Sequence, residues 1–206
     1  MPYPYIERHF HVTDQRLSLA KMELETVDVG NILSTLMKHE KEVHVLDLTD
    51  NLLCSEGIKR LCQTLDFSNI YLKELYLSGN SIGPSAVDAI GRYLANNENL
   101  VVLGLSRCNL GNKGVRTLAN FIGSAQSLQV LDVTGNGARD PAIADLMLTS
   151  GECNHPVDIR YADGNECSDL LEQVDERVRL ARRLRIERLT KGYVAPAEVD
   201  EKTKLA

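Results

Sequence analysis

Pairs of leucines, or of residues that replace them, recur along the chain with one residue between the two members. The pattern starts six times, and successive starts are 29, 29, 28, 28 and 28 residues apart. The pairs are Leu17/Leu19, Leu46/Leu48, Leu75/Leu77, Leu103/Leu105, Leu131/Val133 and Ile159/Tyr161. Side chains two apart on an extended chain point to the same side, so each pair predicts a short strand with one buried face. The fixed period indicates a stacked repeat architecture.

A second apolar pattern begins twelve residues after the first leucine of each pair, with spacings of three and then four. This spacing is typical of one face of an amphipathic helix. The positions are Val29/Ile32/Leu36, Ile58/Leu61/Leu65, Val87/Ile90/Leu94 and Val115/Leu118/Ile122. Each repeat is therefore predicted to contain a strand, a turn and a helix. Stacked units of this kind share one core, with parallel strands on one side and helices on the other.

One further position repeats in the central copies, five residues after the first leucine, where the residue is Asn51, Asn80, Cys108 or Asn136. Together with the period, this pattern resembles leucine-rich repeats, and units of this length with a full helix are similar to the ribonuclease-inhibitor subtype. The resemblance implies an α/β fold: a right-handed solenoid of about six repeats with a concave parallel sheet and convex helices. It also implies that the asparagine is structural, since its amide satisfies backbone groups in a buried turn.

The last repeat is longer than the others. Its helix positions Leu171, Val174 and Val178 are in register with the earlier helices. The apolar pattern then continues to Gly192, a residue suited to a helix C-cap. We therefore expect an extended C-terminal helix whose last turns overhang the solenoid.

These patterns divide the 206 residues into four segments. They are an N-terminal extension (1–13), the solenoid (14–178), an arginine-rich overhanging helix (179–191) and a flexible or partner-bound tail (192–206). Met22 and Gly164 stand where the central copies have asparagine or cysteine. We therefore expect the first and last repeats to be caps, which present a polar outer face to water.

Charge is unevenly distributed. Residues 177–191 carry seven basic side chains against one glutamate, a net charge of +6, whereas the whole chain carries −6 and the remainder therefore −12. Such asymmetry favours binding to an acidic protein surface. The residues predicted to bind are Arg179, Arg182, Arg183, Arg185 and Arg188. The alternative is that these cations complement the helix dipole and form pairs such as Asp175 with Arg179.

The strand positions that alternate with the buried leucines are predicted to form the concave face. Val45, Val102 and Val130 give an apolar strip beside Tyr76, and carboxylates surround it, as in an interface core with a polar edge. The predicted protein-binding residues are Asp47, Glu74, Tyr76, Val102, Asp132 and Arg160, with Tyr76 as the anchor. The alternative is an ordinary surface, on which small residues such as Gly104 let the strands crowd together.

The cysteines and the hydropathy pattern limit the setting. Five cysteines are an odd number and show no C-x-x-C spacing, so we predict neither a disulfide framework nor a zinc site. No segment approaches the roughly 18 apolar residues that span a bilayer, and the first residues lack the apolar region of a signal peptide. We expect a soluble cytoplasmic protein with no membrane partner, no metal ion and no cofactor.

Other motifs offer little chemistry. Residues 79–83 match the G-x-S-x-G nucleophile elbow, but Asn80 and Ile82 are repeat positions and Ser81 fills a variable one. Two groups of residues could bind a metal, but both have fewer than the four ligands of a typical zinc site. They are His9 with His11, and Cys153 with His155 and Cys167. The acidic body and the lack of interleaved aromatics argue against nucleic acid. We predict that the protein is not an enzyme.

The functional prediction is a non-catalytic interaction or scaffold module, a subunit docked in a larger cytoplasmic assembly. The repeat subtype favours the cytoskeleton or a cilium as its location, by analogy within the family. As an alternative, a short array that ends in an arginine-rich helix resembles the C-terminal actin-capping domain of tropomodulin, which implies binding to an actin filament end. The Ran GTPase-activating proteins share the subtype and give a third hypothesis.

Overall fold

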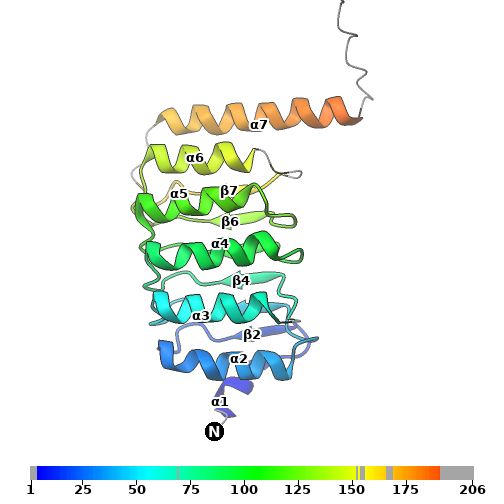
Figure 1. Cartoon of the computed structure of the whole chain (residues 1–206), viewed down its shortest axis with the longest axis vertical. Helices are drawn as coiled ribbons and strands as arrows, with labels where there is room; N and C mark the ends of the chain where they lie inside the picture. Colours follow the sequence, from blue (N-terminus) through cyan, green and yellow to red (C-terminus); the bar gives the residue numbers. More distant parts are fainter. Residues whose placement is uncertain (1–3, 69, 152, 154–155, 166–168, 191–206) are drawn as a thin grey trace, which may run out of the picture.

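The computed structural model describes residues 4–68, 70–151, 153, 156–165 and 169–190. In the last of these ranges the side chains of residues 169, 170, 172, 175, 181, 182, 185, 186 and 188–190 lie outside the description. The chain forms a column of stacked strand–helix units with the N-terminus at one end and the long helix α7 at the other (Figure 1).

One sheet runs the length of the column, in the order β1 to β7. Its strands are β1 (Phe10–His11), β2 (Arg16–Ser18), β3 (Val45–Asp47), β4 (Glu74–Tyr76), β5 (Val102–Gly104), β6 (Val130–Asp132) and β7 (Asp158–Arg160). Strands β2 to β7 are parallel, and the first leucine of each pair lies opposite the first leucine of the next. The six predicted strands and the α/β solenoid are confirmed.

Helices cover one face of the sheet (Figure 1). They are α1 (Pro4–Glu7), α2 (Val29–Lys38), α3 (Ser55–Asp66), α4 (Val87–Asn96), α5 (Gly111–Ile122), α6 (Asp140–Ser150) and α7 (Asp169–Thr190), with short 3-10 turns at Thr26–Asp28 and Pro84–Ala86. Pro84 is the first residue of its turn and directly follows Gly83. Proline suits this position because the N–H group that it lacks would have no hydrogen-bond partner within the helix. None of the described helices has a stretch long and apolar enough to span a bilayer.

The core lies between the sheet and the helices. The leucine pairs of the first five repeats and all four predicted helix triplets are buried. Ile159 and Tyr161 of the last repeat are only partly buried and pack against the edge of this core. The two periodicities therefore identify the core residues correctly, and the burial weakens at the C-terminal end.

The N-terminal segment adds an element that the repeat pattern does not contain. Strand β1 pairs antiparallel with β2, and Ile6 of α1 is fully buried in the core. The Lys38 ammonium donates to both oxygens of the Glu7 carboxylate, at 2.8 and 2.9 Å, which joins α1 to α2. Residues 4–11 thus close the first repeat.

Helix α7 changes character along its length. Leu171 and Val178 are buried, with 2% and 8% exposure, whereas Leu180 and Leu184 are exposed at 56% and 47%. The helix extends past the ends of the other helices (Figure 1). Contact with the solenoid core therefore fades beyond Val178.

Candidate protein-binding surfaces

A ladder of side-chain amides fixes the turns that follow the strands. The Asn80 amide group donates to the carbonyl oxygens of Leu48 and Leu77, both at 2.9 Å, and its oxygen accepts from the N–H of Leu53 at 3.1 Å. Asn51 and Asn136 make the same kind of contacts in their repeats. These bonds join neighbouring repeats, so the structural interpretation of the asparagine position is confirmed.

Cys108 occupies the same place without an amide. Its thiol lies 3.3 Å from the Leu77 carbonyl oxygen, close enough for a weak hydrogen bond. Burial raises the pKa of this thiol to about 12, which keeps it protonated as a donor at neutral pH.

The expectation that Gly164 fills this position in the last repeat is wrong. Asn165 fills it: its oxygen accepts from the N–H groups of Asn136 and Ala138, at 3.1 and 2.9 Å. Its amide group donates to the carbonyl oxygens of Val133 and Tyr161, at 3.0 and 2.6 Å. The turn is one residue longer here than in the central repeats. Counting five residues from Ile159 therefore gives Gly164 and misses Asn165. The ladder therefore continues into the last repeat.

The G-x-S-x-G match at residues 79–83 belongs to one of these turns. Asn80 is used in the ladder, Ile82 is buried and Ser81 is exposed. These contacts favour the repeat-based interpretation of the motif. Within the described residues, no group of three or more His, Cys, Asp or Glu side chains could hold a metal ion.

The sheet face opposite the helices, called the concave face after the sequence prediction, carries two rows of side chains that run across the parallel strands. The strand register aligns Arg16, Val45, Glu74, Val102, Val130 and Asp158 in one row, and Ser18, Asp47, Tyr76, Gly104, Asp132 and Arg160 in the other. All six predicted concave-face residues lie in these rows. Their contacts divide the face into an N-terminal and a C-terminal half.

In the N-terminal half the polar residues bind one another. The Arg16 guanidinium forms an ion pair with Asp47 and lies 5.6 Å from the centre of the Tyr76 ring. The Tyr76 hydroxyl donates to the Glu74 carboxylate at 2.8 Å. Burial, and then this hydrogen bond, raise the pKa of Tyr76 to about 12. Arg16 was missing from the predicted set because its partner is 31 residues away in the sequence.

Gly104 makes room for this network. A Cβ atom on Gly104 would lie 3.1 Å from Cδ1 of Tyr76 and 3.2 Å from the Ser78 hydroxyl oxygen, closer than most such contacts. Tyr76 is therefore held between Arg16 on one side and a backbone without a side chain on the other. The ring thus has contacts on both sides.

The C-terminal half is more open. Val102 and Val130 are half-buried and adjacent in their row. The Asp132 carboxylate accepts from the N–H and the hydroxyl of Thr134, at 3.0 and 2.8 Å, and Arg160 donates to Asp158 at 3.3 Å. The charged groups are thus held by short local contacts around two valines.

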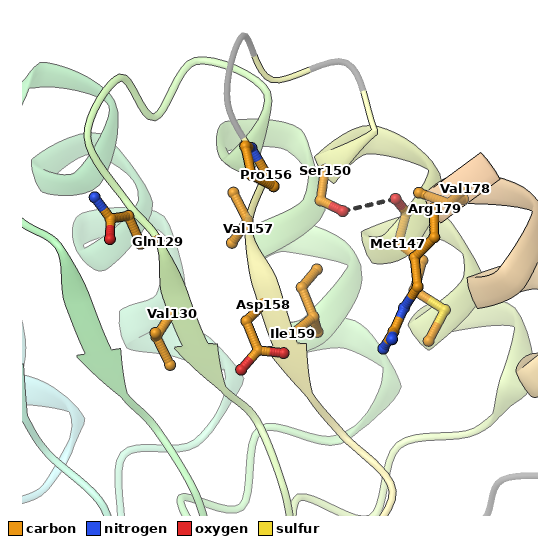
Figure 2. Close-up of a pocket in the computed structure, with 10 residues that line it drawn as sticks. All are labelled: Gln129, Val130, Met147, Ser150, Pro156, Val157, Asp158, Ile159, Val178 and Arg179. Atoms are coloured by element: carbon orange, nitrogen blue, oxygen red, sulfur yellow. Dashed lines mark hydrogen bonds between the residues drawn. The ribbon is translucent and has the colours of Figure 1, made fainter. Parts of the chain in front are cut away.

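A pocket of about 630 Å³ adjoins this half and was not predicted (Figure 2). Its lining comes from β6, β7, α6 and α7 and includes Val130, Met147, Asp158, Ile159, Val178 and Arg179. The Ser150 hydroxyl in its wall donates to the Met147 carbonyl oxygen at 2.7 Å. The sequence gives no signal for this pocket, because it depends on the position of α7 against β7.

Two of the predicted arginines of α7 have side chains within the described part of the helix. Arg179 and Arg183 are exposed and line a shallow hollow of about 600 Å³ on α7, together with Gln173, Glu176, Arg177 and Leu180. Arg179 also reaches the pocket beside β7. The side chains of Arg182, Arg185 and Arg188 lie outside the described part of the helix.

Comparisons with known proteins agree with this geometry. A family model described as Leucine Rich repeat matches residues 68–91 and 96–119. Ribonuclease inhibitor from Sus scrofa is 29% identical over 161 residues, which cover 64% of this chain and 35% of that protein. The chain is a leucine-rich-repeat protein of the ribonuclease-inhibitor-like type.

Two Mus musculus relatives of this leucine-rich-repeat protein carry further named regions. NACHT, LRR and PYD domains-containing protein 9B is 29% identical over 136 residues, and protein 14 of the same series is 32% identical over 133 residues. The matches cover 63% and 64% of this chain but only 14% and 13% of those proteins. The leucine-rich-repeat chain thus corresponds to a small part of these relatives.

A solved structure of Leiomodin-1 Actin-Binding Site 2 (ABS2) has the same fold as this leucine-rich-repeat protein. The TM-score is 0.60 at 13% sequence identity, and the likeness covers 78% of this chain and 93% of that one. At this identity the likeness shows a shared architecture.

Proposed function

We propose that this solenoid is a non-catalytic interaction module that docks another protein on its concave face, as a subunit of a cytoplasmic assembly of the cytoskeleton or a cilium. Leucine-rich repeats act in protein–protein interaction. The observation that carries the proposal is the arrangement in the concave rows: half-buried Val102 and Val130 lie beside a fixed tyrosine and are surrounded by ordered charges.

Preorganisation supports this choice of surface. Binding loses affinity when side chains must be ordered or when charges lose their partners. Here the Tyr76 ring is held by Arg16 and Glu74, and the Asp132 carboxylate by Thr134. A partner would therefore meet side chains that already have intramolecular contacts. The apolar pair with a polar rim matches the usual composition of an interface.

The test is a quantitative affinity purification from ciliated cells with the full chain as bait. In the variant Val102→Arg/Val130→Arg, two cations replace the apolar pair. In the control Leu148→Arg, the same change is made at an exposed leucine of α6. We expect recovery of the specific partners to fall at least about tenfold for the double variant, the size of a hot-spot loss, and to stay unchanged for the control. Equal recovery from wild type and the double variant would reject the concave face.

Binding to an actin filament end is the second candidate. It rests on the likeness to Leiomodin-1 Actin-Binding Site 2, which extends over 93% of that chain, and on the arginine-rich last helix expected from the sequence. The test is elongation of actin filaments with free pointed ends at increasing concentrations of the protein. Concentration-dependent slowing would support this candidate, and unchanged elongation would remove it. The GTPase-activating hypothesis stays a prediction, which a single-turnover GTP hydrolysis assay would decide.

A further inference from the structure

The outer side of α7 carries leucines where a terminal helix should be polar. Leu171, Val174 and Val178 pack against the core and define the inner side. Leu180 and Leu184 lie two and six residues beyond Val178, which places them about 200° and 240° around the helix from it. They are neighbours at i,i+4 spacing and are both about half exposed. The helix thus has a second apolar stripe, which faces away from the solenoid.

Single exposed leucines are common on protein surfaces and mean little by themselves. This stripe differs in two ways. Leu180 lines the shallow hollow described above, so the surface around it is concave. The exposed side chains of Arg177, Arg179 and Arg183 line this hollow with Leu180, and they outnumber its one described carboxylate, Glu176. The hollow therefore combines an exposed leucine with a net positive charge.

We infer that the outer side of α7 docks an amphipathic helix of a partner protein, one with aliphatic side chains at i,i+4 spacing and glutamates or aspartates beside them. An apolar ridge fits the leucines, and carboxylates beside that ridge complement the excess of cations in the hollow. The inference rests on the proposed function, since it names the chemistry of one partner. It concerns the outer side of α7, which, among the described residues, adjoins the concave rows only through Arg179.

Other occupants fit this surface less well. A second α7 would bring an equally basic segment against residues 177–191, which carry a net charge of +6. Nucleic acid would leave the leucines without a matching contact, and α7 has no aromatic residue on which a base could stack. A membrane-surface helix needs a broad apolar face, whereas two leucines form the described outer stripe.

The test measures binding of the full chain to synthetic peptides by fluorescence anisotropy near physiological salt. The probe is a helical peptide with leucines at i and i+4 and flanking glutamates; the control peptide has lysine at each glutamate position. We expect the glutamate peptide to bind at least about tenfold more tightly. The variant Leu180→Gln/Leu184→Gln should lose this binding by a similar factor, because glutamine keeps the helix but removes the apolar contact.

Two control variants separate this surface from others. Leu148→Gln removes an exposed leucine from α6, and Val102→Arg alters the concave face away from the pocket that Arg179 reaches; both should bind the glutamate peptide as the wild type does. Equal binding of the two peptides, or unchanged binding by the α7 variant, would overturn the inference. Tighter binding to a 20-nucleotide RNA or to anionic vesicles, insensitive to the leucine changes, would also overturn it. If only the concave-face variant lost binding of the glutamate peptide, the α7 site would be contradicted and the proposed function would stand.

Discussion

At the N-terminal end, an antiparallel strand and a short helix close the solenoid, whereas at the C-terminal end β7 is the last strand of the described sheet and α7 alone covers the final repeat. Ile6 and Leu17 are fully buried at the first end, while Ile159 at the other end is only partly buried. The pocket of about 630 Å³ and the exposed leucines of α7 occur at this second end. The contrast is between a closed end with a buried core and an end that exposes apolar surface.

The largest expected effect is on core stability. Leu17→Ala should lower the free energy of unfolding by roughly 2–5 kcal/mol, because it removes a buried side chain and leaves a cavity. Ile159→Ala should cost less than half as much, since its side chain already meets solvent. Urea denaturation followed by circular dichroism measures both. Equal losses of unfolding free energy at the two positions would show that the two ends of the solenoid do not differ in core packing.

The amide ladder gives a more local test. Asn136→Ala leaves buried backbone groups without partners and should cost about 1–3 kcal/mol. Asn165→Ala removes the same kind of contacts at a partly exposed turn and should cost less, but still more than the exposed control Asn120→Ala. The same denaturation series measures all three. An Asn165 variant as stable as the control would mean that the ladder ends before the last repeat.

The concave face predicts a difference in titration. Glu74→Gln should lower the pKa of Tyr76 from about 12, because the carboxylate that accepts its proton becomes neutral, while burial keeps the value above its usual 10.0. Since the folded pKa is raised, Tyr76 stabilises the fold fully below pH 10, and this contribution is lost as the pH rises toward 12. Carbon-13 NMR of the tyrosine rings follows the titration. The matched change Asp132→Asn in the C-terminal half should leave the Tyr76 pKa in place; a shift there would show that the halves are coupled.

The smallest stability effect belongs to α7. Leu180→Gln/Leu184→Gln should change the free energy of unfolding by no more than about 0.5 kcal/mol, as expected for exposed positions. Thermal denaturation beside the peptide-binding assay checks this. A loss of several kcal/mol would show that the outer leucines support the solenoid and would remove the distinction between its ends.

The repeated part of the fold could be predicted from sequence, because strand and helix periodicity determine which side chains are buried. Strand β1 was missed, since its two residues give no periodic signal. Asn165 was missed because one extra turn residue shifts the count. Arg16 was missed as a partner of Asp47, because contacts between stacked repeats join residues about one period apart and depend on side-chain conformation.

Hydrogen–deuterium exchange of the full chain, with and without the glutamate-flanked peptide, tests most directly whether the C-terminal end is the one that binds. The expected result is slower exchange of the amides in α7 and no change in α1, β1 and β2. Slower exchange at the N-terminal end, or no change in α7 at peptide concentrations that saturate the anisotropy signal, would contradict it.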